Sequence, residues 1–464
     1  MRRFLTAAVF LAGFAAAMEA QAQVQPAPLP AGLAEGVAAV KARALGSDLG
    51  FEIVRDLVTE VGPRPAGWDG EARAREWTAA KMKALGFTNV RIEPFTIAAW
   101  RRTAEQFEIA APFKQAIVAT ALGWSAPTPA GGLEGEIIRF PNMAALRAAP
   151  DGSLAGKIAF IDEKMARTQE GGGYGAAQVK RRQGAQVAAA KGAIASIIRT
   201  AGTNAERVAN TGSASPAGAL TPIPAAAVSN PDSDQLARLL AQGPVKLRML
   251  VQVETKADAQ SGNVVGEIRG REKPNEIVAL GAHLDSWDTT LGAQDDATGV
   301  GMAIAAAKFI ADQKQKPRRT IRVILFGAEE TGLLGGDAYV KAHKDELPLH
   351  VTGAESDTGG GAVYRLRTKF ADPAKAAALH GVLSDMAIIT DATPARGASE
   401  MGLIGDAGVP VVDLNLDSYR YFDIHHTIAD TLDKIDRDAY RQQVAAFATF
   451  AYFAAESGWD FRAK

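Results

Sequence analysis

Four short apolar segments in the second half of the chain most restrict the fold that it can adopt. They read EIVALGA (276–282), IRVILFGA (321–328), LHVTGAES (349–356) and VPVVDLN (409–415), with helical segments such as ATGVGMAIAAAKFIADQK between them. Near-continuous apolar strands are typical of a sheet that is covered on both faces. Their alternation with helices predicts an α/β fold with a doubly wound, mixed but mostly parallel sheet.

The remaining length predicts a second structural unit. With 464 residues the chain exceeds one ordinary core. Between about 125 and 255 the pattern changes to short strands at regular spacing with one or two helices, and this stretch contains no histidine. We predict a catalytic domain in two parts, with an inserted β-rich domain between them: residues 44–124, 125–255 (the insert) and 256–464.

The amino terminus has the pattern of a signal peptide. Arg2 and Arg3 precede a short apolar run, and Ala20-Gln21-Ala22 offers a small-x-small cleavage site. We expect residues 1–22 to be removed and the Pro/Ala-rich residues 23–43 to form a flexible leader. The alternative is an uncleaved anchor, but the apolar run is short for a span of ~20 residues. The prediction is a secreted or periplasmic protein without stable membrane association after cleavage.

Composition excludes several kinds of chemistry and partner. The chain has no cysteine, which excludes disulfides, thiolate metal ligands and a cysteine nucleophile. A net charge of −1 gives no electrostatic basis for binding nucleic acid. A serine-hydrolase elbow of the G-x-S-x-G type is also missing from the sequence.

Imidazole and carboxylate side chains follow the predicted strands. His283 and Asp285 follow the first strand, Glu329 and Glu330 the second, and Asp357 the third. Two further pairs lie in loops, Asp295-Asp296 before the long helix and His425-His426 after the fourth strand. Each pair has an ordinary alternative, such as a helix cap or a surface pair. Because ligands bind beyond the carboxyl ends of strands in α/β sheets, we expect these groups to converge.

This set of side chains indicates a two-metal hydrolase. Histidine and carboxylate ligands without thiolate suit catalytic Zn²⁺, and two metals need a bridging carboxylate with about two further ligands each. The residues divide accordingly, with Asp295 as the bridge, His283 and Asp357 on one metal, and Glu330 and His426 on the other. Glu329 remains as a general base.

Six motifs resemble a known family. They are GPRPAG, GAHLDSWD, GAQDDATGV, FGAEETGLLGG, ESDTGG and YFDIHHTIADT. Together they are similar to those of the co-catalytic di-zinc aminopeptidases and glutamate carboxypeptidases, peptidase family M28, over about residues 44–460. The inserted segment resembles a protease-associated domain.

The resemblance implies the same ligand set and two Zn²⁺ per chain, with Glu329 as the base. It further implies that Asp285 orients His283 by accepting its second ring N–H. His426 is preferred over His425 as a ligand because it directly precedes the T-x-x-D-T-like tail. Asp430 in that tail is expected to brace the loop.

These motifs define the substrate-binding residues less well than the metal ligands. The segment ASEMGLIGDAGVP loosely matches a wall of the family's substrate pocket, with Glu400 in place of the usual aspartate. Ser399, Glu400, Tyr421 and His425 are the candidate substrate contacts, and the alternative for the two aromatic rings is packing under the loop.

The expected activity is hydrolysis of a terminal peptide bond in short peptides or dipeptides. The small peptide is the expected partner, and a homodimer is one option for the oligomeric state. Two alternatives stay open on the same fold: a glutaminyl cyclase-like aminoacyl cyclotransferase with one zinc, and an inactive receptor-like binding protein.

Overall fold

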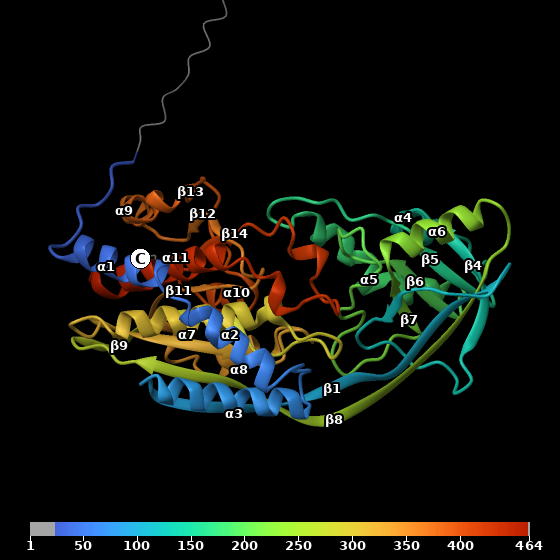
Figure 1. Ribbon diagram of the computed structural model, residues 1–464, viewed down its shortest axis with the longest axis horizontal. Coiled ribbons are helices and arrows are strands. Elements are labelled where there is room, and N and C mark those ends of the chain that lie inside the picture. Colours follow the sequence, from blue (N-terminus) through green and yellow to red (C-terminus); the bar gives the residue numbers. More distant parts are fainter. Residues whose placement is uncertain (1–23, 463–464) are drawn as a thin grey trace, which may run out of the picture.

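The computed structural model describes residues 24–462 and consists of two lobes joined by a long two-stranded ribbon (Figure 1). The ribbon pairs β1 (Thr88–Ala111) with β8 (Lys246–Ile268) in antiparallel register from Thr88↔Glu267 to Ala111↔Lys246. We call residues 24–87 and 269–462 the core lobe, and residues 112–245 the outer lobe. The predicted signal peptide lies outside the described residues.

The core lobe contains the strands predicted from the apolar segments. β9 (Lys273–His283) lies between β11 (His350–Glu355) and β10 (Arg319–Phe326) and is parallel to both. β8 is antiparallel to β10, so the strand order here is β11-β9-β10-β8. The carboxyl ends of the three parallel strands therefore meet at one edge.

Helices cover both faces of this sheet because its side chains alternate between two apolar clusters. Val323 and Leu325 face the cluster that contains α7 (Thr298–Ala311) and α11 (Arg437–Glu456). Ile324 and Phe326 face the opposite cluster, which includes residues of α8 (Leu334–Ala342) and α10 (Ser399–Asp406). The predicted α/β class, with a mixed sheet between helices, is confirmed.

One predicted strand lies in a different sheet from the others. β14 (Val412–Leu416) pairs with β12 (Val363–Thr368), which also pairs with the short β13 (Ile389–Thr390). Its link to the main sheet is an isolated parallel bridge between Gly353 and Val411. The apolar pattern predicted the strand correctly but could not assign its partner.

The outer lobe continues the main sheet beyond β8. Its strands β4 to β7 are parallel to one another, β3 pairs antiparallel with β7, and β4 joins β8. The elements are β2 (Gln115–Ala116), β3 (Ala119–Ala121), β4 (Leu133–Phe140), α4 (Met143–Ala148), β5 (Lys157–Ile161), α5 (Gly173–Ala190), β6 (Ala195–Arg199), β7 (Ala225–Val228) and α6 (Asn230–Leu240). Strands and helices thus alternate here. The domain boundaries at 125 and 255 and the protease-associated type stay predictions.

The amino-terminal helices correct one expectation. The segment 23–43 was expected to be flexible, but α1 (Leu33–Leu45) begins within it and buries Leu33, Val37 and Val40 in the core. The helical spacing of these residues explains the packing. The other helices of the core lobe are α2 (Leu49–Glu60), α3 (Asp69–Ala84) and α9 (Pro373–Leu383).

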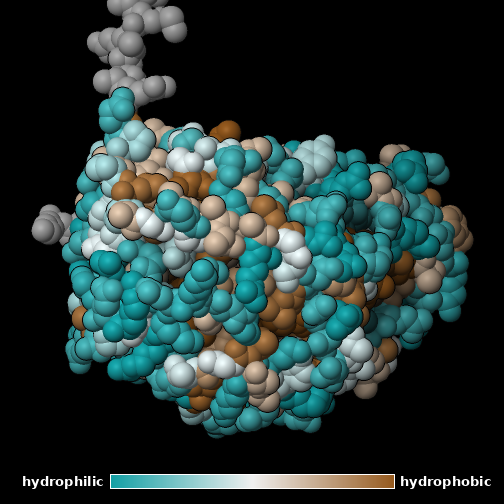
Figure 2. Space-filling model, turned by 60° about the vertical axis from the view of Figure 1, so that its left-hand side comes forward, coloured by the Kyte–Doolittle hydropathy of each residue, from teal (hydrophilic) through white to brown (hydrophobic). Residues whose placement is uncertain are grey.

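Within residues 24–462, no helix is both long and apolar enough to span a bilayer. Figure 2 shows a largely hydrophilic surface, with brown, hydrophobic residues collected in the recessed middle of that face. Most of the predicted site residues line a cavity between the two lobes.

Candidate metal centre

The edge formed by the parallel strands brings the predicted ligands together. His283 is the last residue of β9, Glu329 and Glu330 follow the end of β10 at Phe326, and Asp357 follows the end of β11 at Glu355. The loop before α7 adds Asp295. Because the strands are parallel neighbours, their ends deliver these side chains to one place.

One group of side chains surrounds His283. Its Nε2 lies 3.1 Å from Asp295 Oδ1 and 3.2 Å from Asp357 Oδ1, and the His283 side chain is fully buried. Burial acts to lower the pKa of His283, but hydrogen bonds with Asp285, Asp295 and Asp357 raise it well above its usual value. Asp296, which the sequence analysis did not assign, accepts the main-chain N–H groups of His283 and Gly299 at 3.3 and 2.9 Å.

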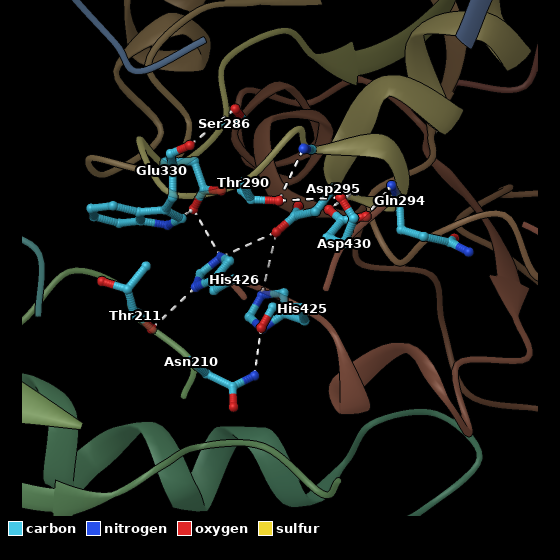
Figure 3. A network of polar contacts seen from close by, with 12 residues as sticks. Asn210, Thr211, Ser286, Thr290, Gln294, Asp295, Glu330, His425, His426 and Asp430 are labelled. Carbon is cyan, nitrogen blue, oxygen red and sulfur yellow. Dashed lines mark hydrogen bonds and ion pairs between the residues drawn. The ribbon is translucent and has the colours of Figure 1, made fainter. Parts of the chain in front are cut away.

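A second group surrounds His426 (Figure 3). His426 Nε2 lies 2.9 Å from Glu330 Oε2 and 3.3 Å from Asp295 Oδ2. Asp295 thus presents one carboxylate oxygen to each imidazole. Burial lowers the pKa of His426 to about 4, so the ring is neutral at pH 7 and can act as a ligand.

These residues fit the demands of a metal site. Asp295 Oδ2 and Glu330 Oε1 are buried, and neither has a hydrogen-bond partner in the part of the chain that the structure describes. Two groups of side chains each have ligand atoms close enough together to hold one cation. The first consists of Asp295, His425 and His426, and the second of His283, Asp296 and Asp357. Unpaired buried carboxylate oxygens are costly without a cation, and the imidazole and carboxylate donors match zinc.

Glu329 lies beside the two groups without joining either. Its side chain is half-buried at the wall of a cavity and makes no hydrogen bond with another described residue. Burial, followed by the charge of Asp357, raises the pKa of Glu329 well above its usual value. A carboxyl group in this environment accepts a proton readily.

The Asp285 carboxylate lies closer to main-chain N–H groups than to the His283 imidazole. Its carboxylate accepts the N–H groups of Glu329 and Glu330 at 3.0 and 3.2 Å. His283 Nδ1 lies 3.1 Å from the main-chain oxygen of Asp285 and 3.7 Å from its carboxylate. The carbonyl is therefore the nearer partner of the second ring nitrogen, and the carboxylate fixes the turn that carries both glutamates.

Two buried groups hold the loop that carries Asp295. Asp430 accepts the N–H groups of Gln294 and Asp295 at 2.6 and 3.1 Å, as expected of a bracing residue. Arg64 is fully buried and donates to the carbonyl oxygens of Leu284, Leu291 and Gly292. Its motif was noted in the sequence, but its contacts span the chain and could not be predicted from local pattern.

Trp287 is a further residue that the sequence analysis missed. Its indole N–H donates to Glu330 Oε2 at 2.6 Å, and its ring packs in a cluster with Trp100 and Trp124. The ring also lies 5.8 Å from that of His426, centroid to centroid. In the sequence, the contact between Trp287 and Glu330 is signalled locally only by the place of Trp287 two residues after Asp285.

The four candidate substrate contacts have different surroundings. His425 stacks on His426 with ring centroids 3.5 Å apart, and Tyr421 lines the same cavity. Ser399 also lines the cavity, and its hydroxyl donates to Asp357. Glu400 is fully buried beside Glu355 and, unlike its neighbour Ser399, does not line the cavity. The assignment of Glu400 as a substrate contact stays a prediction.

The cavity has a volume of about 700 Å³ and lies between the lobes. The core lobe contributes Glu329, Glu330, Asp357 and His426, and the outer lobe contributes Arg181 of α5 and Ser213. A small molecule in this space would touch both lobes and the candidate metal ligands.

Comparison with known proteins gives consistent matches. Residues 263–451 match the model of peptidase family M28. Carboxypeptidase Q of Bos taurus is 31% identical over 88% of this chain and 85% of its own length. A peptidase M28 precursor from Shewanella amazonensis SB2B is 43% identical, with a TM-score of 0.90 over 93% of this chain and 98% of its own. A zinc aminopeptidase from Bacillus subtilis, 20% identical with a TM-score of 0.66 over 90% and 98% of the two chains, shares the fold.

Proposed function

Because the chain belongs to peptidase family M28 and is a zinc metallopeptidase, we propose that it is a di-zinc exopeptidase that acts on short peptides. The observation that carries the proposal is Asp295, whose two carboxylate oxygens face His283 and His426 separately. A carboxylate that offers one oxygen to each side can serve two neighbouring metal ions at once.

The proposed ligands are the residues that meet at the strand ends. His283 and Asp357 would hold one zinc, Glu330 and His426 the other, and Asp295 would bridge them. His425 and Asp296 lie close enough to be considered in the same two groups. When bound, zinc lowers the pKa of a water molecule and polarises a peptide carbonyl.

Glu329 is the proposed general base. It is the carboxylate at the cavity wall that neither imidazole contacts, and its raised pKa suits proton transfer near neutral pH. Glu329 takes the proton that the attacking water gives up and delivers it to the leaving amine. The Asp285 carboxylate supports this step by fixing the main chain at Glu329.

The position of the cavity between the lobes supports a small substrate. The core lobe lines it with proposed ligands and the outer lobe lines it with Arg181 and Ser213, so a substrate must fit between the two lobes. We propose that the peptide binds with its scissile carbonyl near Asp295 and that Tyr421 and Ser399 contact or frame it.

Replacing Glu329 tests the assignment. Glu329→Gln should retain two zinc ions per chain and lose peptidase turnover by a factor on the order of 10²–10⁴, the usual contribution of a general base. Glu35→Gln, an exposed glutamate on α1, serves as the control and should match the wild type. Turnover close to wild type in a zinc-loaded Glu329→Gln variant would refute the role of Glu329.

Metal stoichiometry separates this function from a cyclotransferase. A cyclase with one zinc would leave one of the two groups without a role, whereas elemental analysis of the di-zinc enzyme should give two ions per chain. The predicted export through residues 1–22 is a separate proposal, which sequencing of the mature amino terminus tests.

A further inference from the structure

His426 has a main-chain conformation that a histidine rarely adopts. Its φ angle is +60°, in the left-handed region that favours glycine. The side chain on this unusual backbone is a proposed zinc ligand, with Nε2 at 2.9 Å from Glu330 Oε2. A residue in such a conformation is strained and keeps it only where its surroundings hold it. The contacts of the main chain on either side of His426 therefore matter for the metal centre.

Two consecutive residues of the outer lobe hold the peptide groups on both sides of His426. The Asn210 side-chain amide donates to the His425 carbonyl oxygen at 2.5 Å, and the Thr211 main-chain N–H donates to the His426 carbonyl oxygen at 3.0 Å. Figure 3 shows Asn210 and Thr211 approaching the two histidines. Because φ and ψ are the rotations between two planar peptide groups, holding both groups fixes the backbone of His426.

The Asn210 amide is itself held in one orientation. Asn210 is only 1% exposed. The Thr200 hydroxyl oxygen accepts the Asn210 main-chain N–H at 2.7 Å, and the hydroxyl proton is donated to the Asn210 side-chain oxygen, also at 2.7 Å. The amide nitrogen is thereby directed to the His425 carbonyl. A Cβ at Gly202 would come within 2.2 Å of the Asn210 side-chain oxygen, so the glycine leaves the space that the amide needs.

We propose that Asn210 is a positioning residue of the metal centre, through which the outer lobe fixes the geometry of His426 without providing a ligand. This inference rests on the proposed two-metal function. Without the Asn210 donor the loop can relax to an unstrained conformation, and a bound zinc ion must then restore the left-handed one. The effect should fall on the zinc held by Glu330 and His426, since His283 and Asp357 are carried by strand ends of the core lobe.

Zinc affinity measured by competition with a chromophoric chelator tests this role. The wild type should give two dissociation constants, and Asn210→Ala should weaken one of them roughly 5- to 30-fold, the factor that corresponds to the usual cost of one left-handed residue. Glu330→Gln identifies that constant, because it removes a ligand of the same ion. Asn210→Leu fills a similar volume without an N–H and should lose affinity as Asn210→Ala does. Wild-type affinity in Asn210→Leu would assign Asn210 to packing and overturn the proposal.

Asn204 is the matched control. It is also a buried asparagine of the outer lobe, at 8% exposure, and its amide donates to a main-chain carbonyl of the same core-lobe loop, that of Asp423, at 2.8 Å. Asn204→Ala therefore loses the same kind of contact, but away from His426. It should lower the melting temperature and leave both zinc constants unchanged. Equal losses of zinc affinity in Asn204→Ala and Asn210→Ala would show a general loosening between the lobes and refute the specific role of Asn210.

Hydrogen exchange in the wild type provides a second readout. Coupling is reciprocal, so a zinc ion that depends on the held loop must also stabilise the contact that holds it. Chelation of zinc should speed exchange of the Thr211 amide but not of the Leu122 amide, which donates to Ala225 within the outer lobe at 2.9 Å. Unchanged exchange at Thr211 would contradict the coupling.

The two proposals can fail separately. A single zinc per wild-type chain would refute the two-metal function. The role of Asn210 would then stand only if that one constant weakens in Asn210→Ala and not in Asn204→Ala. Two wild-type zinc constants that both persist in Asn210→Ala would refute the role of Asn210 alone.

Discussion

Replacing Trp287 by phenylalanine tests how far the metal centre depends on residues that are not ligands. The change keeps an aromatic ring in the cluster with Trp100 and Trp124 but removes the indole N–H that donates to Glu330 at 2.6 Å. Glu330 Oε1 already lacks a hydrogen-bond partner among the described residues, so the carboxylate would lose the side-chain hydrogen bond that Trp287 donates.

The expected effect is mainly on metal affinity. A hydrogen bond to a charged acceptor contributes about 1.5–3 kcal/mol, which corresponds to roughly 10- to 150-fold in a dissociation constant. Losses of 10–100-fold are usual when a partner of a metal ligand is removed. We therefore expect Trp287→Phe to weaken zinc binding by about one to two orders of magnitude, measured by competition with a chromophoric chelator.

The neighbouring Trp100→Phe variant is the matched control. Trp100 is as buried as Trp287, at 5% exposure, but its N–H donates to the Ser125 carbonyl at 3.2 Å instead of a site carboxylate. Both variants should lower the melting temperature because both leave space in the same cluster. If the two lose zinc affinity equally, the effect comes from cluster packing and the role assigned to the Trp287 N–H is refuted.

Three further changes test the supports of the site and the core lobe. Arg64→Lys should lower the free energy of unfolding by about 2–4 kcal/mol in urea denaturation, because several buried carbonyl groups lose their donor. Ser399→Ala should weaken zinc binding by about 10-fold in the chelator assay, since Asp357 loses a hydroxyl partner, and unchanged affinity would contradict this. Burial acts to lower the pKa of His343, but the hydrogen bond with Glu93 raises that pKa above its usual value of 6.5 overall. The protonated ring therefore stabilises the fold fully below pH 6.5, and this contribution to the free energy of unfolding is lost as pH rises through the folded-state pKa. In urea denaturation, the free energy of unfolding of His343→Gln should fall less with rising pH than that of the wild type.

The positions next to strand ends were predictable from the sequence because parallel strands share one edge. His283, Glu330 and Asp357 each follow an apolar run that fixes its strand, and the structure brings them within reach of the Asp295 loop. Local pattern was sufficient here because the strand, the most buried element, determines where the next side chain emerges.

Contacts between distant segments could not be predicted in this way. Trp287 and Arg64 act through partners far along the chain or through packing, so their surroundings carry no short-range pattern. Glu400 shows another limit: its motif suggested a cavity wall, whereas its side chain is fully buried beside Glu355. Which face of a short helix meets solvent depends on tertiary packing.

The ribbon of β1 and β8 also constrains the order in which the protein folds. Its residues nearest in sequence, Ala111 and Lys246, are separated by the whole outer lobe, yet β8 is also the neighbour of β10 in the core lobe. Closing so long a loop has an entropic cost, which falls once the intervening residues are compact. Early collapse of residues 112–245 would therefore bring the two strands together, and the core-lobe sheet would gain its fourth strand late. In this sequence of events the outer lobe is compact before β8 completes the core-lobe sheet beside β10.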